Sequence, residues 1–217
     1  MKKYLVIGSP IEHSFSPKLH NHWIKKNNIN AIYEKQKLSK NEIEDLILQV
    51  KERKINGINV TVPFKKTVIP YLDQLSLEAE STQSVNTIYL DNDKVLGHNT
   101  DIDGFELGII NSKFEVAGKK VFILGAGGVV PSIIFALNKM KVSEITISNR
   151  TKDKAESLKS LFKNLKIIDW GDIPEFDMII NATSLGLNKN DQINLDFSKI
   201  GKNKFFYDVI YNPKETN

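Results

Sequence analysis

The feature that most constrains the fold is an apolar run that ends in glycines. Residues 121–124 are Val-Phe-Ile-Leu, residues 125–128 are Gly-Ala-Gly-Gly, and an apolar helical pattern continues to Leu137. A strand, a glycine turn and a helix in this order place backbone amides where they bind a pyrophosphate. Val130 replaces the third glycine of the fingerprint, so we expect the helix to pack less closely or differently. The pattern predicts a dinucleotide site, and a tight turn without a ligand is the alternative.

Arg150 follows the next predicted strand, residues 144–148, and bears on the choice of dinucleotide. The end of this strand meets the adenosine ribose, where an acidic residue favours NAD and an arginine favours the 2′-phosphate of NADP. Arg53 and Arg150 are the only arginines among 30 basic residues. A guanidinium binds phosphate through two hydrogen bonds and stacks on adenine, which lysine does not do. We therefore predict NADP, while Lys152 and Lys154 either add positive charge there or are only solvated.

Strand and helix patterns alternate along the whole chain, which predicts an α/β fold. With 217 residues, the chain has room for two domains of about 100 residues each. We place the domain boundary near Gly104, giving domains 1–104 and 105–217. The predicted strands are 3–8, 57–62, 85–90, 121–124, 144–148 and 178–180, and the predicted helices include 17–27, 40–53, 65–73 and 104–110. A polar turn at 181–184 is suited to the nicotinamide ribose, or is only a loop.

The stretch 57–65 has the pattern of an active-site strand. In an extended chain, Asn59 and Thr61 share one face, while Ile58, Val60 and Val62 point into a core. Pro63 ends the strand, and Lys65 follows just past its end. Two polar side chains and a lysine at one strand end indicate a site for chemistry. An ordinary edge strand with an exposed lysine is the alternative.

Polar side chains elsewhere in the first domain are candidates for the same site. Ser14 and Ser16 precede a predicted helix that starts at Pro17 with Ser16 as its cap, and two hydroxyls there can bind a carboxylate. Asn86 supplies an amide that can hold a hydroxyl, and Asp101 supplies a carboxylate just before a helix. The alternatives are a solvated Ser14 and an Asp101 that only caps its helix.

Composition excludes several classes of function. The net charge is +4, but lysines are scattered among acidic residues, so we expect no nucleic-acid partner. The chain has no cysteine, which excludes disulfides and thiolate sites and fits a reducing compartment. No apolar run is long enough for a signal peptide or membrane span, so we expect a soluble cytoplasmic protein. His98, Asp101 and Asp103 have spacing compatible with a metal, but no recognised ligand motif supports one.

Taken together, these segments resemble the shikimate dehydrogenase family. The matching motifs occur in the family's order across the chain: 8–11 (Gly-Ser-Pro-Ile), 13–17 (His-Ser-Phe-Ser-Pro), 59–65 (Asn-Val-Thr-Val-Pro-Phe-Lys), 85–87 (Val-Asn-Thr), 99–101 (Asn-Thr-Asp), 125–128 (Gly-Ala-Gly-Gly), 149–151 (Asn-Arg-Thr), 181–184 (Asn-Ala-Thr-Ser) and 207–213 (Tyr-Asp-Val-Ile-Tyr-Asn-Pro). The resemblance implies a substrate domain with a mixed, mostly parallel sheet, followed by a Rossmann-type domain for NADP. It also implies a possible homodimer.

The resemblance also implies roles for individual residues and a reaction. The reaction is reversible reduction of 3-dehydroshikimate to shikimate by NADPH, in the biosynthesis of chorismate and aromatic amino acids. Lys65 and Asp101 would be the catalytic pair. Shikimate would be bound by Ser14, Ser16, Thr61, Asn86 and Tyr211, and NADP by Gly125, Ala126, Gly127, Gly128, Val129, Asn149, Arg150, Thr151, Lys154 and Val209.

Two departures from the family leave alternatives open. Family members usually continue past the Tyr-Asn-Pro segment with a glycine-rich loop, a substrate-binding glutamine and helices that return to the first domain, whereas this sequence stops at Asn217. We expect either a fragment or a pocket open on one side. Gln83-Ser84 replaces the family's more usual Gly-Ala, so we expect a less tight turn. A quinate or dual-specificity dehydrogenase, with NADP or NAD, and a non-catalytic NADP-binding module remain as other functions.

Overall fold

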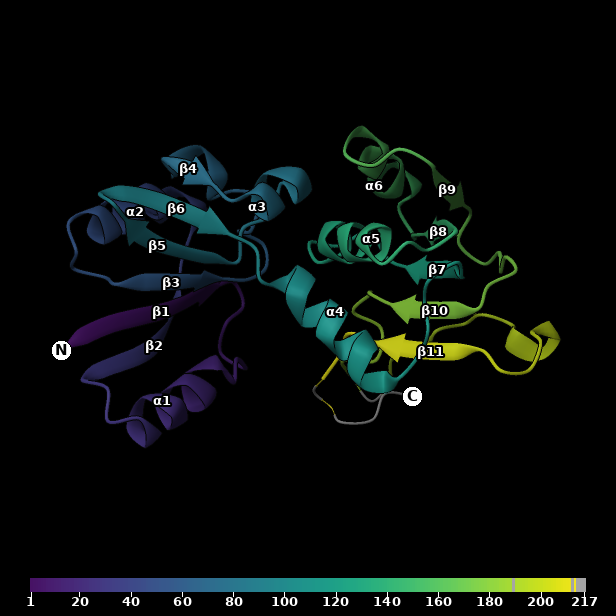
Figure 1. Cartoon of the computed structure of the whole chain (residues 1–217), viewed down its shortest axis with the longest axis horizontal. Coiled ribbons are helices and arrows are strands. Elements are labelled where there is room, and N and C mark those ends of the chain that lie inside the picture. Colours follow the sequence, from purple (N-terminus) through teal and green to yellow (C-terminus); the bar gives the residue numbers. More distant parts are fainter. Residues whose placement is uncertain (189, 212, 214–217) are drawn as a thin grey trace. The chain divides into compact units, whose positions relative to one another are not determined.

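The structure is a computed structural model, and it describes residues 1–188, 190–211 and 213 (Figure 1). The chain forms two compact units, residues 1–101 (the first unit) and 102–217 (the second unit). The first unit ends at Asp101, three residues before the boundary expected near Gly104. Each unit is built on its own β-sheet, one mixed and one parallel, which confirms the predicted fold class.

The first unit holds a six-stranded mixed sheet with the order β2-β1-β3-β5-β6-β4. Strands β1, β2 and β3 are parallel, and β5 is antiparallel to both β3 and β6. The elements, in chain order, are β1 (Lys2–Gly8), α1 (Ser16–Lys26), β2 (Ala31–Lys37), η1 (Lys40–Glu42), α2 (Ile43–Lys51), β3 (Gly57–Val60), η2 (Ile69–Tyr71), β4 (Gln74–Leu75), α3 (Leu77–Thr82), β5 (Thr87–Asp91) and β6 (Lys94–His98).

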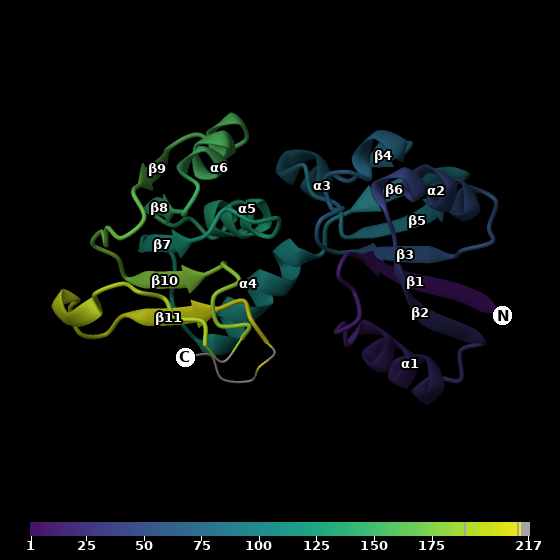
Figure 2. The same cartoon turned by 180° about the vertical axis from the view of Figure 1, so that it is seen from behind.

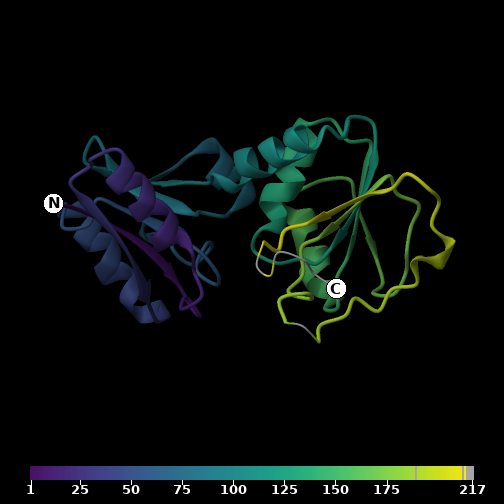
Figure 3. The ribbon, with the colours of Figure 1, turned by 90° about the horizontal axis from the view of Figure 1, so that it is seen from below.

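The side chains of β1 alternate between two cores, as expected for a strand covered on both faces. Leu5 and Ile7 pack with the apolar residues of α2, whereas Tyr4 and Val6 pack with Ile24 of α1. The helices α1 and α2 therefore lie on opposite faces of the sheet, which Figure 3 shows with the sheet between them.

Two expectations for the segment after β3 were wrong. The strand ends at Val60, and Val62 is 60% exposed rather than in the core, because the chain leaves the sheet in a turn that begins at Val62. The helix expected over 65–73 is replaced by turns and the short η2, because Pro70 has no N–H to donate within that span. Gln83 ends α3 with φ of 48°, a conformation that favours glycine. Glutamine therefore adopts the left-handed conformation at the position where the family more often has glycine.

The second unit holds a five-stranded parallel sheet with the order β11-β10-β7-β8-β9 (Figure 2). Its first helix starts three residues before the expected Gly104. The elements are α4 (Asp101–Ser112), β7 (Lys120–Leu124), α5 (Val130–Lys139), β8 (Glu144–Ser148), α6 (Lys152–Glu156), η3 (Ser157–Ser160), β9 (Leu165–Ile168), β10 (Met178–Asn181), η4 (Phe197–Lys199) and β11 (Phe205–Asp208).

The two faces of this sheet are covered by different kinds of structure. Val121 and Ile123 of β7 pack with the apolar side chains of α4, α5 and α6. Phe122 and Leu124, on the opposite face, pack with Phe176 and with residues from the connections before β10 and β11. None of the helices in the described part of the chain is long and apolar enough to cross a membrane.

The order of the parallel strands reverses at β7. The chain runs from β7 outward to β8 and β9, then returns to the other side of β7 to form β10 and β11. In such sheets a ligand binds beyond the carboxyl ends of the strands where the direction reverses, here between β7 and β10. The fold therefore places the Gly125 turn and the polar turn after Asn181 at the position where a dinucleotide is expected.

Candidate active site

Lys65 and Asp101 form a close ion pair in the first unit. The Lys65 Nζ atom lies 2.5 Å from Asp101 Oδ2, and the two side chains are 14% and 24% exposed. Lys65 lies in the turn after β3, where its backbone carbonyl accepts a hydrogen bond from Val85 N at 2.9 Å. Asp101 is the first residue of α4. The structure thus brings together two residues that are 36 positions apart in the chain.

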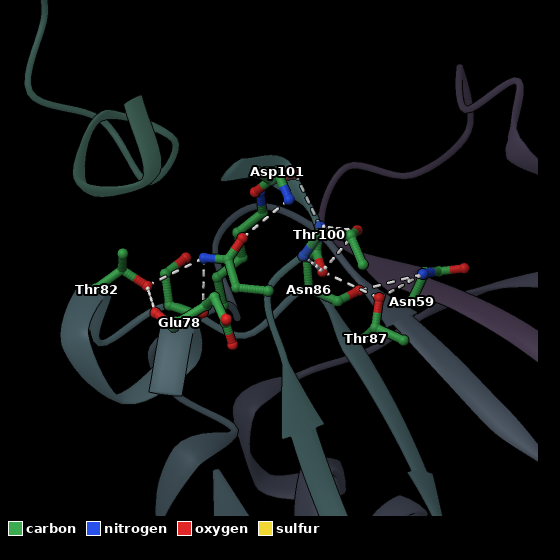
Figure 4. A network of polar contacts seen from close by, with 10 residues as sticks. Asn59, Glu78, Thr82, Asn86, Thr87, Thr100 and Asp101 are labelled. Carbon is green, nitrogen blue, oxygen red and sulfur yellow. Dashed lines mark hydrogen bonds and ion pairs between the residues drawn. The ribbon is translucent and has the colours of Figure 1, made fainter. Parts of the chain in front are cut away.

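Asn86 holds the other oxygen of the Asp101 carboxylate (Figure 4). Its Nδ2 donates to Asp101 Oδ1 at 2.8 Å and also lies 2.9 Å from Thr100 Oγ1. Its Oδ1 accepts from Thr100 N at 3.0 Å and from Thr87 Oγ1 at 3.0 Å. Each carboxylate oxygen of Asp101 therefore has its own donor, which fixes the carboxylate beside the lysine.

Tyr33 and Asn59 extend this polar network, and the sequence did not single out Tyr33. The Tyr33 hydroxyl donates to Asn59 Oδ1 at 2.6 Å, and Asn59 Nδ2 donates to Thr87 Oγ1 at 3.2 Å. Burial raises the pKa of Tyr33, and a hydrogen bond with Ser16 acts in the opposite direction. The phenol is therefore a neutral donor at physiological pH. Alternation placed Asn59 on a polar face, but no pattern in the sequence pairs it with residue 33.

Ser14 and Ser16 lie close together at the start of α1. Ser16 N donates to Ser14 Oγ at 3.3 Å, and both residues are half-buried. Ser16 was expected to cap the helix, and this was wrong: α1 begins at Ser16, its N-cap is Phe15, and no side chain makes a capping bond there. The Ser16 hydroxyl is therefore not used as a helix cap.

Thr61 lies directly after β3 and is half-buried. Its backbone N–H donates to Ile7 O at 2.9 Å, which ties it to the end of β1. A Cβ atom at Gly8 would lie 2.6 Å from Thr61 Cγ2, so glycine at position 8 leaves the space that the threonine methyl occupies. Thr61 thus lies at the same carboxyl edge of the sheet as the segment that leads to Lys65.

The glycine turn after β7 contacts the polar turn after β10. Gly125 is buried, has φ of +109°, and a Cβ atom there would lie 2.7 Å from Ala182 O. Gly127 and Gly128 are exposed, and a Cβ at Gly128 would meet no atom within 4 Å. Val129 is the N-cap of α5, and Val130 is fully buried in the core between helices and sheet. Position 130 therefore packs through a valine side chain, where the fingerprint has glycine.

We expect Gly125→Ala to lower both the melting temperature and the affinity for NADP+. The substitution puts a side chain on a residue with positive φ and drives a methyl group into a backbone carbonyl. We expect the Kd for NADP+, measured by calorimetry, to rise at least about tenfold, because amides of this turn would meet the pyrophosphate. Gly171→Ala is the matched control, since Gly171 has φ of +112° and open space around it. An equal effect of the two changes on NADP+ affinity would contradict this role of Gly125.

Arg150 is exposed in the segment that follows β8. Asn149 Nδ2 donates to Thr151 O at 2.7 Å, which closes the turn around the arginine. Lys152 is paired with Asp169 at 2.8 Å, so it is not free to act as an additional phosphate ligand, whereas Lys154 is exposed. Within residues 1–188, 190–211 and 213, the structure shows no ion pair or hydrogen bond of the Arg150 guanidinium. The arginine is thus available to an anionic ligand.

Asn181 organises the polar turn after β10. Its Nδ2 donates to Leu185 O at 3.0 Å, and its Oδ1 accepts from Thr183 N at 3.1 Å and from Thr183 Oγ1 at 2.7 Å. Val209 follows β11, and its N–H donates to Asn181 O at 3.1 Å. Val209 therefore lies at the same sheet edge as the glycine turn.

Tyr211 is the last predicted substrate-binding residue, and a metal at His98, Asp101 and Asp103 was only an alternative that the sequence did not favour. Tyr211 is 75% exposed, and its neighbour Asn212 lies outside the described residues. No group of three or more His, Asp or Glu residues in the described part of the chain is arranged to hold a metal ion. The spacing of His98, Asp101 and Asp103 therefore does not correspond to a ligand cluster.

A curated relative from Pelagibacter ubique strain HTCC1062 is named shikimate dehydrogenase (NADP(+)). It is 59% identical over 216 residues, which are 100% of this chain and 82% of the relative. The chain belongs to the shikimate dehydrogenase family. The family predicted from the sequence is thereby confirmed. The shikimate dehydrogenase substrate binding domain model matches residues 6–88, and the shikimate / quinate 5-dehydrogenase model matches residues 108–211.

Solved shikimate dehydrogenases share the fold over nearly the whole chain. The enzyme from Thermus thermophilus, solved in complex with NADP(H) and shikimate, is 27% identical with a TM-score of 0.87, and the match covers 98% of this chain and 80% of that one. The enzyme from Listeria monocytogenes, solved with shikimate and NAD, is 28% identical with a TM-score of 0.90, covering 100% and 81%. Within the shikimate dehydrogenase family, complexes with both dinucleotides are thus known.

Proposed function

We propose that this protein catalyses the reversible, NADP-linked interconversion of shikimate and 3-dehydroshikimate. The observation that carries this proposal is the Lys65–Asp101 pair at 2.5 Å, held by Asn86 at the carboxyl edge of the first sheet. The names of relatives that match 97–100% of this chain support the substrate and the cofactor. A module that only binds NADP would have no need for this polar cluster in the first unit.

Lys65 would supply the proton that accompanies reduction of the carbonyl. Its ammonium can polarise the carbonyl oxygen and donate a proton as that oxygen becomes an alcohol. The ion pair with Asp101 holds the lysine side chain in one direction. Asp101 would therefore orient Lys65 and a substrate hydroxyl, while Asn86 holds the carboxylate in place.

Polar side chains of the first unit would bind shikimate. We assign Ser14 and Ser16 to the substrate carboxylate, and Thr61 and Asn86 to ring hydroxyls. Tyr211 is assigned from the family resemblance alone. Hydroxyl recognition of this kind gives selectivity, because a wrong polyol leaves buried polar groups without partners.

The second unit would bind NADP. The cofactor supplies the hydride, so the protein has to bind and orient it. Residues 125–129 provide backbone amides for the pyrophosphate, and Asn149, Arg150, Thr151 and Lys154 surround the 2′-phosphate. The buried Gly125 and the exposed Arg150 guanidinium fit this ligand, because the first permits close backbone approach and the second is available to bind the phosphate. Val209 would lie against the nicotinamide.

The test is the initial rate of reduced-nicotinamide formation with shikimate or quinate, each with NADP+ or NAD+. We expect turnover with shikimate and NADP+. Faster turnover with quinate would favour the dual-specificity alternative, which the name of the matched shikimate / quinate 5-dehydrogenase model keeps open. Binding of NADP+ without turnover of either substrate would overturn the proposal in favour of a non-catalytic module.

We also propose a homodimer that works in the cytoplasm. The family resemblance and the prevalence of twofold assemblies support the dimer. The lack of cysteine supports a reducing compartment.

A further inference from the structure

Asn99 is a fully buried polar residue next to Asp101. Its side chain has 0% exposure, although it lies in the short connection between β6 and α4. Its Oδ1 accepts a hydrogen bond from the backbone N–H of Asp101 at 3.0 Å. Asn99 thus holds the main chain of the first residue of α4, while Asn86 holds the carboxylate of the same residue.

The other end of the Asn99 amide is fixed by α3. Asn99 Nδ2 donates to Thr82 Oγ1 at 3.1 Å and to Ser84 O at 2.9 Å. Thr82 is 1% exposed, and its hydroxyl donates to Glu78 O at 2.6 Å (Figure 4). Because the hydroxyl proton points to Glu78, the Thr82 oxygen is available as an acceptor. Because the Asp101 amide is a donor, the atom facing it must be the Asn99 oxygen, so the orientation of the Asn99 amide is determined.

We propose that Thr82 and Asn99 are positioning residues for Asp101 in the reaction. This proposal rests on the proposed function, in which Asp101 orients Lys65. Thr82 bonds to Asn99, Asn99 holds the backbone of Asp101, and Asp101 pairs with Lys65. Their effect would pass through the Asp101 backbone, whose position sets where the carboxylate meets the lysine.

A small displacement of Asp101 is enough to matter for catalysis. A misplacement of about 1 Å far from the chemistry can lower a rate about 100-fold, because the reacting groups lose their alignment. Removing the Thr82 hydroxyl takes away one acceptor of Asn99 Nδ2 and leaves Ser84 O. We therefore expect a smaller loss, about tenfold, from a change at position 82.

The first experiment compares Thr82→Val with Thr82→Ser in the full chain. Valine has nearly the same shape as threonine but no hydroxyl, whereas serine keeps the hydroxyl. We expect Thr82→Val to lower kcat about tenfold with an unchanged KM for NADP+, and Thr82→Ser to restore most of kcat. Thr146→Val is the matched control. Thr146 is a threonine of β8 with 3% exposure, so this variant shows how much kcat falls when a buried threonine hydroxyl elsewhere in the fold is removed.

The decisive experiment combines Thr82→Val with Asp101→Asn. If Thr82 acts through Asp101, the valine change lowers kcat less than about twofold once the carboxylate is gone. A full tenfold loss in that background, or a loss of kcat in Thr146→Val as large as in Thr82→Val, would overturn the proposal.

A measurement without turnover separates this proposal from the proposed function. Hydrogen exchange of the Asp101 amide should become at least about tenfold faster in Asn99→Ala than in the wild type, because its acceptor is lost. Unchanged exchange would overturn the positioning role even in an active enzyme. Faster exchange in a protein that turns over neither shikimate nor quinate would retain the Asn99 contact while rejecting the assigned reaction.

Discussion

We expect Lys65→Ala to lower kcat for shikimate oxidation by about 1,000-fold and to leave the Kd for NADP+ unchanged. Lys65 is proposed to transfer the proton, whereas the residues proposed to bind NADP belong to the second unit, so the change removes the proton donor and leaves the NADP-binding residues in place. The loss should appear in kcat rather than in the cofactor KM, because Lys65 acts on the reacting oxygen. Steady-state rates and calorimetric NADP+ binding measure the two effects separately.

Lys66→Ala is the control for this prediction. Lys66 is the next residue, is exposed, and carries the same charge, so its removal should leave kcat within about twofold of the wild type. An equal loss of turnover and NADP+ affinity in Lys65→Ala would contradict the catalytic role, because it would indicate general damage to the fold.

Arg150→Ala is expected to lower kcat/KM for NADP+ about 100-fold and to leave kcat/KM for NAD+ nearly unchanged. A charged hydrogen bond to phosphate is worth about 1.5–3 kcal/mol, and the two bonds of a guanidinium fork add to this. NAD has no 2′-phosphate, so the loss of the arginine removes little from its binding. Parallel rate measurements with the two dinucleotides give the ratio directly.

The other arginine provides the control. Arg53 is exposed, lies in the first unit and is paired with Asp93 at 2.6 Å, so Arg53→Ala should leave both kcat/KM values unchanged. A parallel fall with NADP+ and NAD+ in Arg150→Ala would contradict recognition of the 2′-phosphate by this arginine.

Local patterns predicted the parts of the fold that depend on neighbouring residues. The strand before Gly125 and the glycine turn were predicted, because an apolar run, a cluster of glycines and a helical pattern follow one another directly in the sequence. Alternation also placed Ile58 and Val60 in the core correctly. It failed at Val62, because alternation holds only while the strand continues, and the strand ends at Val60.

The candidate site was predictable only where a motif marked it. Lys65 and Asp101 were paired through the family resemblance, since nothing local relates residues so far apart in the chain. Thr82 and Asn99 could not be paired, because their contact depends on how α3 packs beside the connection between β6 and α4. Ser16 was predicted to be the N-cap because it precedes Pro17, which was taken as the first residue of the helix. The helix instead begins at Ser16, one residue earlier.

The separate cores of the two units have a consequence for how such an enzyme can evolve. Lys65 and Asn86 lie beside strands of one sheet, and Gly125 and Arg150 follow strands of another. A mutation near Arg150 that changes the preference for the dinucleotide need not disturb Lys65 or Asn86, and the reverse also holds. New polyol substrates and new electron carriers can therefore be acquired one at a time.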